Sequence, residues 1–438
     1  MDVHASPAAL PELKEFLGAF QVRFRRPEGA EALERYTTGL LTELPNKNCD
    51  TMAQAVPGTS EQRLQEFLTN MQWDQEDLNR QRVQKLLVEA TLSDGVLVLD
   101  DTGFPKQGKA SVGVARQYSG TLGKVGNCQV AVTCCYTEPQ ASWPVGVRLY
   151  LPRPWTDDPE CCRKARVPPE VTFQTKPELA LRLLDQARAW GVPHCCVVAD
   201  ADYGDNPNFL AGLEARDERY VVGVRADFQV VCTRKTISPR QRADQVLQSL
   251  PRRQWRTIRW RQGSKGWLRK KFVAVRCWRV TTEGRRCVGW LLGERTTQGQ
   301  TEDRKYYWSN LPAAATLEKL AGYAHRRHAV EPCHEEAKGE LGWDHYQGRL
   351  WAGFHRHAVT VMLAYSFLMW LELRQRRAPR GRGRPRDPFS PSTGPAAPYP
   401  PGGASRGCPL ATPPGRAMVG DNASLHRTLL TKVLTKQY

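Results

Sequence analysis

Apolar residues recur at helical spacing through the first part of the chain. Stripes of this kind occur in Pro11–Phe24, in the segment after Thr59-Ser60-Glu61 and in Asp77–Ala90. Residues three and four apart share one face of a helix, so these patterns predict an N-terminal helical domain over residues 1–94. From Met1 to Gly95 there are 10 Lys and Arg against 15 Asp and Glu. Two interpretations stay open, a DNA-binding helical module and a helical packing domain.

Short, continuous apolar runs replace the helical spacing from Gly95 onward. Such runs are typical of strands that are covered on both faces. Amphipathic helices are predicted between them, over Glu178–Trp190 and Asn208–Arg216. Together they predict an α/β fold in which a mixed sheet is flanked by helices, with residues 95–225 as its first part. The predicted strands are Val96–Leu99, Cys128–Tyr136, Val145–Leu151, Cys195–Asp200 and Tyr220–Val224.

Residues 226–311 alternate polar and apolar positions and are strongly basic. Alternation in Lys271–Arg276 and near Cys287–Leu292 predicts antiparallel strands. From Arg225 to Asn310 there are 21 Lys and Arg against 6 Asp and Glu, interleaved with tryptophans. Basic residues beside aromatic rings suit phosphate contact and base stacking, whereas tryptophans in an ordinary sheet belong to its core. We expect both, with some tryptophans buried and the arginine face exposed to DNA.

Helical spacing returns over Thr316–Lys338 and Ala352–Gln375, which predicts a second part of the core over residues 312–377. Residues 378–438 are rich in Pro, Gly, Ser and Arg, and this composition is typical of disorder. Arg382–Pro385 resembles a short hook for the DNA minor groove, and a solvated basic tail is the alternative.

The formal net charge of +18 favours a polyanion partner, and nucleic acid is the commonest one. An acidic membrane surface is the alternative, but no basic amphipathic helix supports it. No secretory leader pattern is present, and the longest apolar stretch, Ala358–Leu371, is shorter than a membrane span. A cytoplasmic protein is expected, so its thirteen cysteines should be reduced thiols. Their adjacent pairs do not have the spacing of zinc sites.

Carboxylates follow two of the predicted strands in the same way. Val96–Leu99 leads into Asp100 and Asp101, and a later apolar run ends on Asp200 with Asp202 nearby. A lone aspartate at such a position is more often a turn cap. Two carboxylates at one sheet edge, however, suit hard divalent cations, which prefer oxygen ligands.

A third group of polar residues lies in the predicted helix Thr316–Lys338. At 3.6 residues per turn one face would carry a carboxylate flanked by cations. For Arg327 and Glu331 alone, a surface pair at i, i+4 is the simpler explanation. The residues of this face are Tyr323, Arg327, Glu331, His334 and Lys338.

In combination these motifs resemble the DDE transposases of bacterial insertion sequences, whose core is RNase H-like. Arg327, Glu331 and Lys338 keep the last two spacings of the Y-R-E-K signature of the cut-and-paste group, while Tyr323 lies one residue too far from Arg327. The segments around Asp100-Asp-Thr102 and Asp200-Ala-Asp-Tyr203 are also similar to this family. The resemblance makes residues 226–311 a basic β insertion before the catalytic glutamate.

The resemblance implies a metal-dependent DNA transposase that cuts element ends and transfers 3′-hydroxyl strands to target DNA. Asp100, Asp200 and Glu331 would bind Mg²⁺ or Mn²⁺, with Asp101 and Asp202 as reserves. Arg327, Lys338 and Tyr323 would complete the catalytic set. Inverted-repeat and target DNA are the implied partners, with a homodimer in the synaptic complex and the bacterial nucleoid as the site of action.

Pro332 departs from the family pattern, because a proline inside a helix costs on the order of 3 kcal/mol. It is tolerated if a helix restarts there, which would move Tyr323 and Arg327 onto a separate segment. Two other functions stay open. One is an inactive DNA-binding remnant, and the other is a metal-dependent nuclease without strand transfer.

Overall fold

The structure is a computed structural model that describes residues 10–90, 95–138, 141–232, 239–263, 266–296 and 304–377. The predicted disordered tail, residues 378–438, lies outside the described residues.

Helices make up the N-terminal region, as the apolar stripes predict. The helix expected over Pro11–Phe24 is shorter, because it ends at Gly18 and a 3₁₀ turn follows at Gln21–Arg23. Side-chain caps mark the later helix starts, and the Ser60 hydroxyl accepts from the Arg63 amide at 3.2 Å. Two helices, α2 and α3, were not predicted. The elements are α1 (Pro11–Gly18), α2 (Pro27–Leu41), α3 (Cys49–Ala55), α4 (Glu61–Thr69) and α5 (Gln75–Glu89).

A mixed sheet of ten strands forms the centre of the molecule, in the order β2-β3-β1-β5-β6-β12-β11-β10-β9, with β4 also paired to β3. β1, β5 and β6 are parallel neighbours, whereas β3 runs antiparallel to β1. This arrangement, flanked by helices, confirms the mixed α/β, RNase H-like fold. The strands are β1 (Val96–Pro105), β2 (Ala115–Ser119), β3 (Lys124–Glu138), β4 (Ala141–Leu149), β5 (Cys196–Ala199), β6 (Tyr220–Val224), β9 (Arg256–Gly263), β10 (Gly266–Val280), β11 (Arg286–Arg295) and β12 (Arg304–Ser309).

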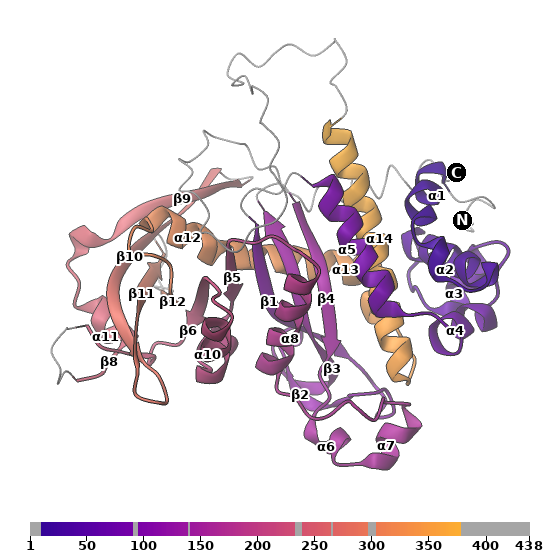
Figure 1. The fold of residues 1–438 in the computed structure, drawn as a ribbon, viewed down its shortest axis with the longest axis horizontal. Helices are drawn as coiled ribbons and strands as arrows, with labels where there is room; N and C mark the ends of the chain where they lie inside the picture. Colours follow the sequence, from indigo (N-terminus) through magenta and orange to yellow (C-terminus); the bar gives the residue numbers. More distant parts are fainter. Residues whose placement is uncertain are drawn as a thin grey trace, which may run out of the picture.

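The basic strands continue this same sheet. β12 pairs antiparallel with β6, so the basic strands β9–β12 extend from the edge of the core strands, at the left of Figure 1. A separate two-stranded sheet joins β7 (Gln229–Val230) to β8 (Gln241–Arg242). The predicted domain boundaries stay predictions.

Helices pack against the sheet and against one another. α8 (Lys176–Ala189) packs against β1, β3 and β4, and α14 (Trp351–Arg377) packs against β4 and three N-terminal helices. Figure 1 shows α5 and α14 side by side between the sheet and the other N-terminal helices. None of the helices in the described ranges is both long and apolar enough to cross a membrane. The shorter helices are α6 (Arg153–Thr156), α7 (Pro159–Lys164), α9 (Ala201–Gly204), α10 (Pro207–Ala215) and α11 (Ala243–Gln248).

The single helix predicted over Thr316–Lys338 is wrong. The segment forms α12 (Leu317–Arg326), a 3₁₀ turn (Arg327–Ala329) and α13 (Val330–Gly339). Pro332 is the third residue of α13, where a backbone N–H would have no partner within the helix, so proline costs little there. The alternative of a restarted helix is therefore the one that the structure has.

The first strand also differs from its prediction. β1 does not end in a turn after Asp100 but continues to Pro105, paired with β3 throughout. Only its pairing with β5 ends here, at Leu99 opposite Ala199. Asp100 therefore lies at the point where the neighbouring parallel strand leaves the sheet.

Candidate active site

Asp100 is held inside the sheet rather than on a flexible turn. Asp100 is 8% exposed as a whole residue, and it lies opposite Thr133 on β3. The carboxylate accepts a hydrogen bond from the Asp101 amide at 2.9 Å. Because adjacent strand residues point to opposite faces, Asp100 and Asp101 face different sides of the sheet.

Asp200 follows β5 directly and caps α9. Its carboxylate accepts hydrogen bonds from the amides of Asp202 at 3.0 Å and Tyr203 at 3.4 Å. α9 lies so close to β6 that a Cβ on Gly204 would stand 1.9 Å from the Gly223 carbonyl oxygen. Glycine at this contact lets the turn after β5 fold back and place Asp200 beside Asp100.

Arg327 connects the carboxylates of three separate segments. Its Nη2 lies 3.7 Å from Oδ2 of Asp100 and 3.7 Å from Oδ2 of Asp200. Its Nη1 donates to Oε1 of Glu331 at 3.0 Å. The structure thus brings Asp100, Asp200 and Glu331 around one guanidinium, which comes from the 3₁₀ turn between α12 and α13.

Glu331 is the most exposed of the three carboxylates, with its side chain 50% exposed. The ring nitrogen Nδ1 of His328 lies 3.3 Å from its Oε1, beside the bond from Arg327. The contact with His328 is the main reason that the pKa of Glu331 is lowered to about 2, and Arg327 adds to the shift. Glu331 therefore remains a carboxylate over the physiological pH range.

The two aspartates have the opposite electrostatic character. Burial raises the pKa of Asp100 to about 7, Arg327 opposes this shift, and the charge of Asp200 adds to it. Burial likewise raises the pKa of Asp200, and Arg327 again opposes the shift. Burial alone would lower the pKa of Arg327, but the three carboxylates raise it. Both aspartates therefore hold their protons more readily than an exposed carboxyl does, and a nearby cation such as Arg327 favours their charged forms.

The reserve aspartates are engaged elsewhere. Asp101 pairs with Lys176 of α8 at 2.9 Å, on the other face of the sheet. Asp202 pairs with Arg225 at 3.0 Å, and both side chains are 64% exposed. The geometry around Arg327 therefore favours Asp100 and Asp200 over their neighbours.

Lys338 and Tyr323 lie apart from the carboxylates in different ways. The Lys338 ammonium donates to the Gly103 carbonyl at 2.8 Å and to the Thr121 hydroxyl at 3.0 Å, so it joins α13 to β1. Tyr323 is 2% exposed on α12, with the Arg326 guanidinium 5.2 Å from the centre of its ring. The single helical face predicted for these residues is wrong, because the 3₁₀ turn interrupts it.

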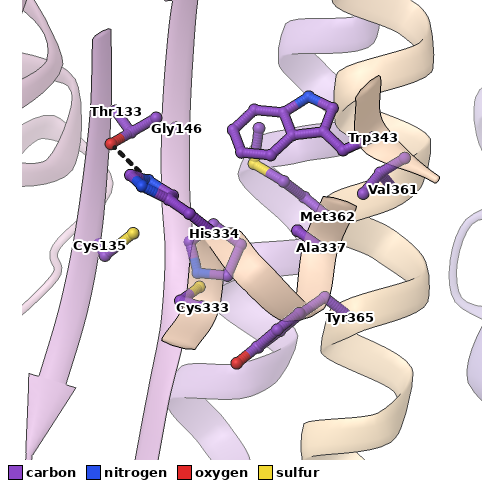
Figure 2. Close-up of a pocket in the computed structure, with 11 residues that line it drawn as sticks. Thr133, Cys135, Gly146, Cys333, His334, Ala337, Trp343, Val361, Met362 and Tyr365 are labelled. Atoms are coloured by element: carbon purple, nitrogen blue, oxygen red, sulfur yellow. Dashed lines mark hydrogen bonds between the residues drawn. The ribbon is translucent and has the colours of Figure 1, made fainter. Parts of the chain in front are cut away.

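Two contacts at this site were not recognised in the sequence. His328 stands three residues before Glu331, and this spacing could have indicated the pair. The contact of His334 with Thr133, drawn in Figure 2, joins residues 201 positions apart, and no local pattern signals it.

The donor set fits a hard divalent cation, since it consists of carboxylate oxygens. Within the described ranges, no three His, Cys, Asp or Glu side chains stand close enough together to hold an ion as they are. The guanidinium of Arg327 lies among the three carboxylates at the place where positive charge is required. An ion held by these residues would take over that charge from Arg327.

The cysteines in the described part of the chain are free thiols. Among these residues, no cysteine belongs to a group of three or more His, Cys, Asp or Glu side chains that could hold a metal ion.

The basic strands present like charges side by side. Arg259 on β9 lies directly opposite Arg269 on β10, both exposed, at the last strand pair of the sheet. Opposed like charges destabilise a sheet unless an anion neutralises them. The tryptophans divide as expected, since Trp308 is 1% exposed and Trp267 is 48% exposed.

Comparison with known proteins places both aspartates and Glu331 within matched regions. The model of DDE superfamily endonucleases matches residues 16–267, and the transposase DDE domain model matches residues 175–367. The chain is also 28% identical over 352 residues to a probable transposase for insertion sequence element IS701 from Microchaete diplosiphon. That alignment covers 79% of this chain and 84% of the relative.

Proposed function

Since this chain belongs to the DDE superfamily endonucleases and is a transposase of the insertion-sequence type, we propose that it cuts the ends of its element and transfers their 3′-hydroxyl strands to target DNA. The observation that supports this mechanism is the convergence of Asp100, Asp200 and Glu331 on one guanidinium, from three separate segments.

Asp100, Asp200 and Glu331 would hold Mg²⁺ or Mn²⁺. When bound, such ions activate the attacking hydroxyl and stabilise the leaving oxygen of an in-line phosphoryl transfer. Burial of Asp100 favours binding, because a buried anionic cluster gains most from a cation. Arg327, relieved of neutralising the carboxylates, is the group that would pair with a phosphate of the DNA.

Double-stranded DNA, as inverted repeats and as target, is the proposed partner. The 21 Lys and Arg between Arg225 and Asn310 supply the electrostatic attraction, and the opposed pair Arg259 and Arg269 would straddle a phosphate. Because two ends must be brought together, the active form would be a homodimer. A DNA substrate would place the protein at the bacterial nucleoid.

The first test is cleavage of DNA that carries the element's inverted repeats, with and without Mg²⁺. Cleavage should require the ion and should fall by at least about a thousandfold in each of Asp100→Asn, Asp200→Asn and Glu331→Gln, because the ligand is lost. Glu160→Gln, an exposed carboxylate on α7, is the matched control. Full activity of Asp100→Asn would contradict the site.

A plasmid target separates the remaining possibilities. Joined 3′-ends indicate a transposase, whereas cleavage without joining indicates a nuclease that lacks strand transfer. DNA binding with neither reaction would indicate an inactive remnant.

A further inference from the structure

We propose that His334 is a positioning residue that holds Glu331 at a fixed distance from Asp100. This inference rests on the proposed function of the three carboxylates. His334 lies on α13, three residues after Glu331, and its side chain points to the strand that pairs with the strand of Asp100.

A continuous hydrogen-bonded path joins the two segments. Nε2 of His334 lies 3.1 Å from the Thr133 hydroxyl, the contact drawn in Figure 2. The same hydroxyl donates to the backbone carbonyl of Asp100 at 3.2 Å. The residue that follows Glu331 by nearly one helical turn is therefore tied to the backbone of Asp100 itself.

The direction of this path follows from the chemistry of its members. A threonine hydroxyl has one proton, and Thr133 donates it to the Asp100 carbonyl, which can only accept. His334 must then donate from Nε2–H, so its neutral tautomer carries the proton on Nε2. Burial lowers the pKa of His334 to about 3, and the charges of Lys338 and Arg327 add to the shift. The ring thus remains neutral, and Nε2–H is its only hydrogen-bond donor.

The surroundings leave the hydroxyl few other partners. His334 borders a cavity of about 10 Å³, which is at the lower limit for one water molecule. Trp343, Met362 and Tyr365 line it with Cys135, as Figure 2 shows. Water is therefore a poor substitute for the imidazole at this position.

A second contact holds the other end of the helix. Lys338 lies one turn beyond His334 and donates to the Gly103 carbonyl on β1 at 2.8 Å. α13 is thus attached to strands β3 and β1 at two points on the side of Glu331 toward its C-terminus. The 3₁₀ turn before Val330 separates α13 from α12, so the alignment of α13 depends on contacts along its own length, and the bonds of His334 and Lys338 are two of these contacts.

Substitution of His334 separates this role from simple packing. His334→Gln keeps an amide N–H that can reach Thr133, whereas His334→Leu keeps the bulk and removes the donor. Thr133→Val removes the hydroxyl with little change in shape. Binding of Mn²⁺ is measured by titration calorimetry in the full chain without DNA, together with urea unfolding.

We expect His334→Leu and Thr133→Val each to weaken Mn²⁺ binding about tenfold, because the carboxylates lose their fixed spacing. His334→Gln should stay within about threefold of the unchanged protein. The double variant that combines His334→Leu with Thr133→Val should be no worse than either single variant, since both remove one path. Glu160→Gln is the control.

The outcomes distinguish the proposed metal function from the proposed positioning role of His334. If the unchanged protein binds no Mn²⁺, or if Asp100→Asn binds it equally well, the proposed metal function fails. If the unchanged protein binds the ion through Asp100 but His334→Leu binds it as tightly, the positioning role is overturned. It is also overturned if His334→Gln loses as much affinity as His334→Leu.

Discussion

At the scale of single residues, the feature that organises the site is one arginine among three carboxylates. Arg327 is 23% exposed at its side chain and contacts Asp100, Asp200 and Glu331. Removing the cation from such a cluster leaves negative charges facing one another, and their repulsion destabilises the folded state. The same cluster then becomes a stronger binding place for any other cation.

Arg327→Gln is expected to lower the free energy of unfolding by about 1–3 kcal/mol in the presence of a chelator. Excess Mg²⁺ should restore most of this loss, because it replaces the missing charge. Urea unfolding with and without the ion measures both effects. Arg225→Gln is the control, since that side chain is 64% exposed and its pairs with Asp202 and Asp205 contribute little. Equal loss with and without Mg²⁺ would contradict the idea.

The proximity of the two aspartates could be predicted from the sequence, whereas the contacts that Arg327 makes with them could not. Asp100 and Asp200 each follow an apolar run, and both ends meet because β1 and β5 are parallel neighbours. The reach of Arg327 to both aspartates depends on the 3₁₀ turn, which changes the direction of the side chain. Pro332 indicates that a helix restarts, but it does not specify where the previous helix ends or how the turn is oriented.

At the scale of elements, two thiol groups lie close together at the basic strand β10. Sγ of Cys232 lies 3.0 Å from Sγ of Cys277 on β10. Val231 and Trp278 exchange two backbone hydrogen bonds at 2.8 and 2.9 Å, so the cysteines occupy the next, closer cross-strand pair. Its backbone separation lies within the range of a disulfide.

Oxidation by diamide is expected to link Cys232 to Cys277. The two thiols lose two protons and two electrons, the S–S bond forms, and the N=N bond of diamide is reduced to the hydrazine. The loop spans 45 positions, so the link should raise the free energy of unfolding by at most about 4 kcal/mol. Mass spectrometry of non-reduced peptides detects it. Cys232→Ser should abolish this product, and Cys49→Ser should not; a dominant link between other cysteines would contradict the geometry.

The opposed arginines of β9 and β10 give a prediction about DNA. The double variant Arg259→Ala and Arg269→Ala should bind double-stranded DNA more weakly at low salt. The slope of log affinity against log salt should become less steep by about 1, because the phosphate contact that the two side chains share is lost. Its unfolding free energy should not fall, since a like-charge pair is removed. Arg163→Ala on α7 is the control, and an unchanged slope in the double variant would exclude these residues from the DNA contact.

The type of an element could be predicted where the pattern of apolar residues along the chain was clear, and elements were missed where that pattern was weak. Tyr220–Val224 was predicted with its observed bounds, because five apolar or small residues form a buried strand. β2 lies in a segment rich in Gly, Lys and Ser, and its exposed alternate residues conceal the strand. Its pairing with β3 is a tertiary contact that overrides local preference.

At the scale of the whole molecule, α14 joins the two ends of the described chain. Most of its 27 residues are buried, and it packs against α2, α4, α5 and β4. Its polar residues are matched with distant partners. The Tyr36 hydroxyl donates to Nδ1 of His357 at 2.8 Å, and the other ring nitrogen of His357 lies 3.2 Å from the Gly342 carbonyl. The helical spacing over Ala352–Gln375 predicted this helix but not the contacts that orient it.

Acid should destabilise the fold through this helix. Burial lowers the pKa of His355 and of His357 to about 4, whereas an unfolded histidine titrates near 6.5. Well above pH 6.5 both histidines are neutral in the folded and in the unfolded state, so their titration does not reduce the free energy of unfolding. As the pH falls toward 4 only the unfolded chain takes up protons, so the free energy of unfolding decreases by about 2 kcal/mol per histidine between pH 7 and pH 5.

Urea unfolding at these two pH values measures the loss. The double variant His355→Gln and His357→Gln should be less stable at pH 7 but should lose most of this pH dependence. His328→Gln, with a partly exposed ring, is the control and should keep it. An unchanged dependence in the double variant would show that other groups are responsible.

The position of α14 also has a consequence for synthesis. It is the last described helix to leave the ribosome, yet it fills the space between helices that are made first. Until Trp351–Arg377 has been translated, α2, α4 and α5 lack the surface against which they pack, and Phe16 lacks the rings of Phe367 and Trp370 that cover it. A copy of the gene that stops before codon 351 should therefore yield an aggregating chain rather than a shortened protein that competes for DNA.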